Sequence, residues 1–238
     1  MYEERIYRRD FITGNLKGFE VVVKETDLFI CAEKDLTSQA IESTLKYRSQ
    51  IESYIEKHPK FKESLSPMPN DLFAMPIIKN MFDVTRRAGV GPMASVAGAM
   101  AEFIGTDLLK FSDEIIVENG GDIFVKLKTN RRIGIFAGKS SFSNKLTIEI
   151  EASKTPLGIC TSSAAIGPSL SFGKTDATVV IAKSAAFADA CATAIGNMVK
   201  QPEDIKKALE FAKKLEGLSA VLIVIADKLG VWGDIKMV

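Results

Sequence analysis

The sequence predicts an α+β fold in which residues 1–238 form a single domain with a mixed, largely antiparallel β-sheet and packed helices. Aliphatic residues recur at every second position in IFVKLK, 123–128, and in LTIEI, 146–150, which is typical of antiparallel strands with one buried face. Two other runs, 177–182 and 220–226, are apolar throughout, and this indicates central strands that are covered on both faces. Helical patterns lie between these two runs.

The N-terminal half begins with a predicted hairpin, because short apolar runs at 19–25 and 28–33 are separated by two residues. From residue 37 to 55 the apolar spacing changes to three and four, which predicts an amphipathic helix. Its buried face is predicted to hold Ala40, Thr44, Tyr47, Ile51 and Tyr54. The prolines of SLSPMPNDLFAMP, 64–76, then predict a loop rather than a domain linker, since the segment is apolar.

Small residues dominate two further predicted helices. The segment AGVGPMASVAGAMAEFIG, 88–105, opens with glycines. It is too rich in glycine and alanine to span a membrane, and Glu102 interrupts it. The segment AAFADACATAIGNMV, 185–199, is predicted to be a buried helix. A last helix is predicted over 202–217, with proline at its start and glycine as its stop.

Composition excludes several classes of function. The 31 basic and 30 acidic residues give a net charge of +1 without a dense basic block, so we expect neither a nucleic-acid nor a membrane partner. Three cysteines and an N-terminus without an apolar segment favour a cytoplasmic protein. The only histidine, His58, lies in a charged stretch and is predicted to be a surface residue, which argues against His-based zinc sites and Ser-His-Asp triads.

The first candidate site is the polar stripe Asp189, Thr193 and Asn197 on the alanine-rich helix. Carboxylate and hydroxyl oxygens are ligands that Mg²⁺ accepts, so Asp189 and Thr193 could hold this metal. The alternative is local. Ser184 would cap the helix, Asp189 would lie near its positive end, and Thr193 would bond back to the Asp189 carbonyl.

A second candidate is the turn VENGGDIFV, in which Asn119, Gly120, Gly121 and Asp122 follow one predicted strand and precede another. The glycines favour a hairpin turn with positive φ. They would equally let a ligand approach a backbone that carries no side chains. On spacing alone both interpretations stay open.

A third candidate is GICTSSAAIGPSLSFGKTDA, 158–177, where Thr161, Ser162 and Ser163 could bind phosphate and Lys174 could add charge. A plain surface loop fits the composition equally well. The upstream segment GVGPMAS could present a helix N-terminus to an anion, but it lacks the lysine of a P-loop.

The order GVGPMASVAGAMAEFIG, VENGGDIFV, CTSSAAIG and FADACATAI resembles the ApbE family of FAD:protein FMN transferases, over roughly residues 85–200. The resemblance is to an uncharacterised cytoplasmic branch related to that family. It implies an ApbE-like fold and a Mg²⁺ bound by Asp189, Thr193 and the backbone carbonyl near Ala94. It also implies that Gly120 and Gly121 lie near the flavin nucleotide.

By the same resemblance, Thr161, Ser162 and Ser163 contact the diphosphate. Asn119 and Asp122 are added to the nucleotide site because they lie beside the two glycines and could donate or accept hydrogen bonds there. The implied ligand is FAD or a related flavin or pterin nucleotide, that is, a small-molecule dinucleotide. An acceptor protein and a homo-oligomer are left open.

Two departures from the family separate binding from transfer. Ser95 stands where the transferases carry a lysine, and the His-x-x-Asp-Pro-x-Thr-Gly segment is replaced by GPSLSFGKTDA. No catalytic residue is therefore assigned. The resemblance predicts either an enzyme that cleaves or transfers at the diphosphate, or a non-catalytic ligand-binding or partner-subunit module that keeps the pocket.

Overall fold

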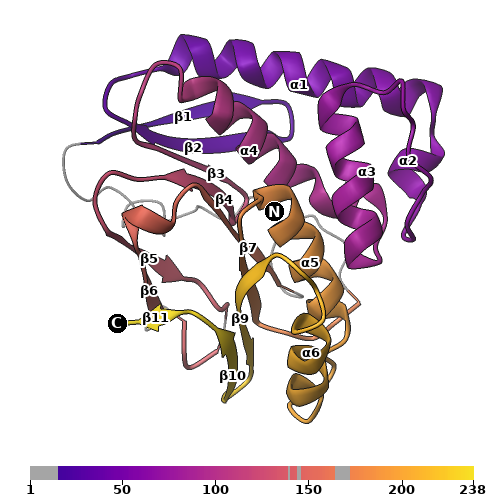
Figure 1. The fold of residues 1–238 in the computed structure, drawn as a ribbon, viewed down its shortest axis with the longest axis vertical. Coiled ribbons are helices and arrows are strands. Elements are labelled where there is room, and N and C mark those ends of the chain that lie inside the picture. Colours follow the sequence, from indigo (N-terminus) through magenta and orange to yellow (C-terminus); the bar gives the residue numbers. More distant parts are fainter. Residues whose placement is uncertain (1–15, 139, 144–145, 164–171) are drawn as a thin grey trace.

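The computed structural model describes residues 16–138, 140–143, 146–163 and 172–238 (Figure 1). The large sheet contains β1 (Lys17–Val23), β2 (Thr26–Ala32), β3 (Ile115–Asn119), β4 (Asp122–Lys126), β7 (Leu157–Ser162), β8 (Ala177–Ala182), β9 (Leu218–Ile225) and β10 (Lys228–Gly233). These eight strands lie in the order β1-β2-β3-β4-β7-β8-β9-β10. The small sheet contains β5 (Arg131–Ile135), β6 (Leu146–Ile150) and β11 (Lys236–Met237), in the order β11-β6-β5.

The helices are α1 (Thr37–Lys57), α2 (Lys60–Glu63), α3 (Pro76–Ala88), α4 (Val96–Leu108), α5 (Ala185–Asn197) and α6 (Asp204–Ala212). Two 3₁₀ turns, η2 (Pro92–Ser95) and η3 (Ala152–Lys154), complete the described elements. The predicted α+β class is confirmed, and all strand pairs in the described ranges are antiparallel. Within those ranges no helix has the length and apolar character needed to cross a membrane.

The elements form three layers, with the large sheet in the middle. One core lies between this sheet and the helices and contains Ile30, Ile104, Phe124, Val180 and Ile195. A second core lies between the large and small sheets and contains Cys31, Ile123, Ile133, Ile148 and Val179. Figure 1 shows the helices above and to the right of the large sheet and the small sheet on the other side. Successive residues of a central strand therefore point into different cores.

The predicted N-terminal elements agree with the structure. The hairpin pairs β1 with β2 and closes at Val23 and Thr26, where Lys24 has a φ of 53°. On α1, Ala40, Thr44, Tyr47 and Ile51 are buried as expected. The loop at 64–76 connects α2 to α3, and Pro76 is already the first residue of α3.

Some boundaries and elements differ from the expectations. The last predicted helix, 202–217, is observed only as Asp204–Ala212, because the chain turns after Ala212 through 3₁₀-type bonds such as Leu215 N–H to Ala212 C=O. The helices α2 and α3 had no predicted counterpart. The apolar runs at 177–182 and 220–226 are central strands as predicted, since β8 and β9 lie inside the large sheet and all of β8 is buried. The segment 123–128 is not half-buried as predicted, because β4 contributes Phe124 to one core and Ile123 to the other.

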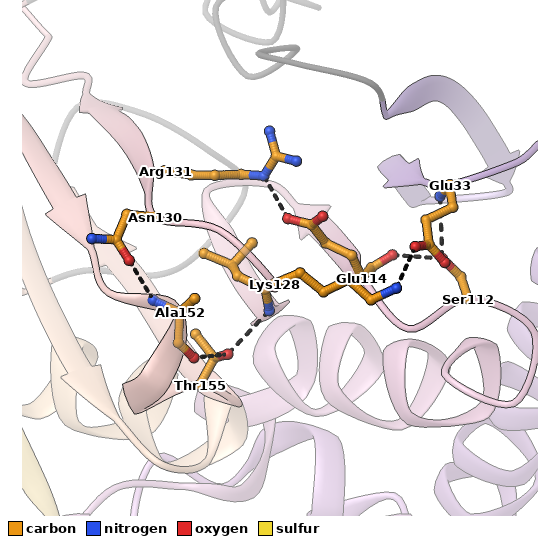
Figure 2. A network of polar contacts seen from close by, with 9 residues as sticks. Glu33, Ser112, Glu114, Lys128, Asn130, Arg131, Ala152 and Thr155 are labelled. Atoms are coloured by element: carbon orange, nitrogen blue, oxygen red, sulfur yellow. Dashed lines mark hydrogen bonds and ion pairs between the residues drawn. The ribbon is translucent and has the colours of Figure 1, made fainter.

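A polar network joins the two sheets away from the predicted site residues (Figure 2). Arg131 of β5 donates from Nε to Glu114 Oε1 at 2.8 Å, and both side chains are buried. Ser112 Oγ donates to the Glu114 carbonyl at 2.6 Å, and Lys128 pairs with Glu33 at 2.7 Å. Because the buried charges of this network are paired, we assign it a structural role.

Candidate functional site

The candidate site lies where α4 and α5 cross over the large sheet. Gly98 of α4 makes this crossing close, since a Cβ at this position would lie 2.4 Å from the Ala185 carbonyl oxygen and 2.8 Å from Asp189 Cβ. Gly158 of β7 plays the same part beneath α5, because a Cβ there would lie 2.2 Å from Ala185 Cα. Glycines at 98 and 158 therefore let a helix, a second helix and a strand meet at the start of α5.

Asp189 points from α5 toward the first turn of α4. Its Oδ2 accepts a hydrogen bond from the Gly98 N–H at 2.9 Å, and the Ala97 N–H also bonds to the carboxylate. Burial raises the pKa of Asp189 to about 7, and these two amides act in the opposite direction. The carboxylate is therefore a partner for the unsatisfied N–H groups at the start of another helix, α4, rather than of its own.

Glu102 makes the reciprocal contact from α4 to α5. Its Oε2 accepts hydrogen bonds from Ser184 Oγ at 2.7 Å and from the Ala186 N–H at 3.0 Å. Ser184 is the N-cap of α5, as predicted, and accepts from the Phe187 N–H at 3.2 Å. Glu102 was not predicted as a site residue, although a lone carboxylate in a glycine- and alanine-rich helix is the same signal that identified Asp189.

The predicted Asn-Gly-Gly-Asp turn is a tight hairpin between β3 and β4. Asn119 pairs with Asp122, and Gly120 and Gly121 have φ values of 67° and 99°, which glycine adopts without strain. Asn119 Nδ2 donates to the Ala97 carbonyl at 3.1 Å, so the turn is bonded to the start of α4. The Gly121 N–H donates to Glu118 Oε1 at 2.7 Å and is thus already used within the protein.

Asp122 is the second carboxylate of the site. Its side chain is buried, with a relative exposure of 7%, and its Oδ1 has no hydrogen-bond partner among the described residues. Burial and the nearby charge of Asp189 raise the pKa of Asp122 well above its ordinary value. A buried carboxylate oxygen without a partner is costly, which marks this position as one that a bound group could complete.

The three predicted hydroxyls are divided by the large sheet. On β7, Cys160 packs in the helix-side core and Ile159 in the core between the sheets. By strand alternation Ser162 faces the helices, as Asp122 does, and Thr161 faces the other side. Thr161 lies beside the glycine turn, since a Cβ at Gly121 would be 3.8 Å from its carbonyl oxygen. Ser163 is the last described residue before 164–171, and that part of the predicted segment 158–177 lies outside the described ranges.

Thr193 follows Asp189 by one turn of α5 and is partly buried. Other helical threonines of the chain bond back to the carbonyl four residues earlier, as Thr85 does to Met81 at 2.6 Å. In the described part of the chain Thr193 makes no such bond to the Asp189 carbonyl, so the local alternative does not account for its hydroxyl. Ala94 lies in η2, which packs against α5. Asn197 Oδ1 accepts a hydrogen bond from the Phe172 N–H at 2.8 Å, so this oxygen already has a partner within the protein.

The donor set fits a hard divalent cation. Asp122 and Asp189 are both carboxylates, neither forms an ion pair with a lysine or arginine within the described ranges, and one oxygen of Asp122 lacks a partner. No group of three or more His, Cys, Asp or Glu residues in that part of the structure is placed to hold a metal ion. A metal here would therefore complete its coordination with hydroxyl, carbonyl, water or phosphate oxygens, which is usual for Mg²⁺.

Two predicted accessory groups lie elsewhere. Lys174 lines a cavity of about 610 Å³ at the far end of α5, together with Asp176, Lys200 and Asp227, and this cavity contains neither carboxylate of the site. His58 is exposed at the end of α1 and stacks on the Tyr54 ring at 4.4 Å, which confirms the surface position predicted for it.

Comparison with solved structures defines the class of protein. The flavinyl transferase ApbE of Pseudomonas stutzeri aligns with a TM-score of 0.55 at 13% identity, covering 91% of this chain and 93% of that one. A flavin transferase ApbE from Vibrio cholerae gives a TM-score of 0.57 at 12% identity, covering 91% and 96%. The chain thus has an ApbE-like α+β fold, as the resemblance predicted.

Sequence comparison then gives the family. The protein-family model described as "AbpE bacteria" matches residues 9–231, and the chain belongs to this ApbE-like family. A UPF0280 protein of Methanocaldococcus jannaschii is 40% identical over 221 residues, which is 90% of each chain. Another UPF0280 protein, from Methanococcus aeolicus, is 38% identical and covers 91% of this chain and 90% of its own.

Proposed function

We propose that the protein binds FAD or a related flavin or pterin dinucleotide together with Mg²⁺ and cleaves or transfers at the diphosphate. The observation that carries this proposal is the meeting of Asp189, Asp122 and Asn119 at the start of α4, on one face of the sheet. The solved proteins of the same fold are flavin transferases, and this similarity supports a flavin as the substrate class.

In this proposal each residue has a limited task. Asp189 anchors the metal through its carboxylate and Thr193 adds a hydroxyl, with the Ala94 carbonyl as a third ligand. A bound Mg²⁺ would supply charge neutralisation at the diphosphate. Ser162 faces the same side and would donate to a phosphate oxygen. Gly120 and Gly121 carry no side chains, which suits the close approach of a ring or ribose to the backbone of the turn.

The experiment is incubation of the purified protein with FAD and Mg²⁺, followed by chromatography. We expect FMN and AMP, and we expect both products to be lost in Asp189→Ala. The matched control is Asp227→Ala, which removes an exposed carboxylate in the β9–β10 turn. Absence of binding to any nucleotide by the wild-type protein would remove the basis of the proposal.

A second candidate is a non-catalytic module that binds the same ligand. The observation in its favour is that, among the described residues, no histidine or lysine bonds to Asp189 or shifts its pKa. Ser95 stands where the family carries lysine, and its hydroxyl is buried and donates to the Pro92 carbonyl at 2.9 Å. Tight nucleotide binding without product formation would select this candidate. A cytoplasmic location, an acceptor protein and a homo-oligomer stay predictions.

A further inference from the structure

We propose that Asp122 is a second carboxylate ligand of the divalent cation held by Asp189, so that the metal bridges the β3–β4 turn and α5. This inference rests on the metal site proposed above and deepens it. The family resemblance assigns the cation only to the Asp and Thr of the α5 motif and to a backbone carbonyl, and it places the turn near the nucleotide.

The first argument is the state of the Asp122 carboxylate. Asp122 is more than nine-tenths buried. The Cys160 side chain and the Thr161 N–H bond to its carboxylate, but Oδ1 has no hydrogen-bond partner in the described ranges. The other buried carboxylates nearby are provided for, since Glu114 pairs with Arg131 and Glu118 accepts from the Gly121 N–H. Native structures rarely leave a buried charged oxygen unpaired, and a bound ion is one of the standard explanations.

The second argument is where the carboxylate lies. Asp122 is two residues before Phe124, which packs in the helix-side core, so its side chain is on the face covered by α4 and α5. Its register partner on β7 is Cys160, whose Sγ donates to the Ala185 carbonyl at 3.2 Å. Asp189 follows Ala185 by one helical turn. The charge of Asp189 also acts on the pKa of Asp122, which places the two carboxylates within electrostatic reach.

The third argument concerns the kind of cation. Two carboxylates that share a mostly buried site repel each other unless a positive charge lies between them. No lysine or arginine forms an ion pair with either one among the described residues, and hard oxygen ligands select Mg²⁺, Mn²⁺ or Ca²⁺ over softer metals. Two anionic ligands match a doubly charged ion and leave its remaining positions for hydroxyl, water and phosphate oxygens.

The test measures binding of Mn²⁺ alone by electron paramagnetic resonance and by isothermal titration calorimetry, without nucleotide. We expect Asp122→Asn to weaken Mn²⁺ binding by about tenfold or more, in the range seen when groups that support a metal are lost. Asp189→Asn should weaken it at least as much, and the surface variant Asp227→Asn should bind like the wild type. Added Mg²⁺ should raise the Tm of the wild type but not that of Asp122→Asn.

A further variant separates loss of a ligand from loss of folding. Asp122→Glu keeps a carboxylate and should bind Mn²⁺ more tightly than Asp122→Asn does. If Asp122→Asn binds like the wild type while Asp189→Asn does not, the inference about Asp122 is wrong and the proposed metal site stands. If the wild type binds no Mn²⁺, the metal site fails and this inference fails with it.

Discussion

The crossing of α4 and α5 makes a direct prediction for Gly98→Ala. The new Cβ would lie 2.4 Å from the Ala185 carbonyl oxygen, whereas ordinary contacts begin at 3.4 Å, so the helices must separate by about 1 Å. Overpacking of this kind costs roughly 1–3 kcal/mol. The hydrogen bond from the Gly98 N–H to Asp189 would stretch as the helices move, and a bond to a charged group is worth about 1.5–3 kcal/mol.

Helix propensity acts in the other direction, because alanine is favoured over glycine inside a helix by about 1 kcal/mol. We therefore expect Gly98→Ala to lower the free energy of unfolding by about 2–3 kcal/mol in urea denaturation. The matched control is Gly134→Ala on β5, where an added Cβ meets nothing within 4 Å and should be nearly neutral. An unchanged or higher urea midpoint for Gly98→Ala would refute the close crossing.

Three other perturbations follow from the described contacts. Glu102→Gln keeps an acceptor for Ser184 but loses the charge at the start of α5, and we expect a loss of about 1 kcal/mol in urea unfolding. Arg131→Met leaves Glu114 buried without its partner, which should lower the free energy of unfolding by about 3 kcal/mol or more. The double variant Arg131→Met, Glu114→Gln should recover part of that loss. Neither variant should change the affinity for Mn²⁺. The folded-state pKa of Asp189 is raised from 3.8 to about 7, so the native state binds the extra proton. The free energy of unfolding of the metal-free wild type, relative to that of Asp189→Asn, should then fall as pH rises from about 4 to 7, by up to about 1.4 kcal/mol per pH unit. A difference between the two proteins that does not change with pH would contradict this.

Much of the fold could be predicted because the relevant signals are local. The alternation at 146–150 and the apolar run at 177–182 follow directly from how many faces of a strand are covered. The prediction of one buried face at 123–128 was wrong, because β4 lies between the helix-side core and the core between the sheets. The helix α3 was not predicted although its sequence is strongly amphipathic, since its first residue, Pro76, was assigned to the preceding loop. The end of the last helix was placed too late, because Gly217 marks the end of the following turn rather than of the helix itself.

The site was predictable in its residues but less so in its geometry. The sequence identified Asp189, Asn119 and Asp122. The structure bonds Asp189 and Asn119 to the start of α4 and brings Asp122 within electrostatic reach of Asp189. The sequence could not show that Asp189 serves the amides of a different helix, because that contact joins residues 91 positions apart. The sequence also could not show that Thr161 and Ser162 lie on opposite faces of the large sheet, because this depends on the position of β7 between the two cores.

The contact between Asp189 and α4 bears on how a metal would be held. A carboxylate has two oxygens with about four lone-pair sites, so an oxygen that accepts from the Gly98 N–H can still bind a cation. That amide fixes the orientation of the carboxylate, as hydrogen bonds behind a metal ligand commonly do. The positive end of α4 would by itself weaken cation binding next to it. A second carboxylate offsets that effect, which gives Asp122 a physical reason to be buried with one oxygen unpaired.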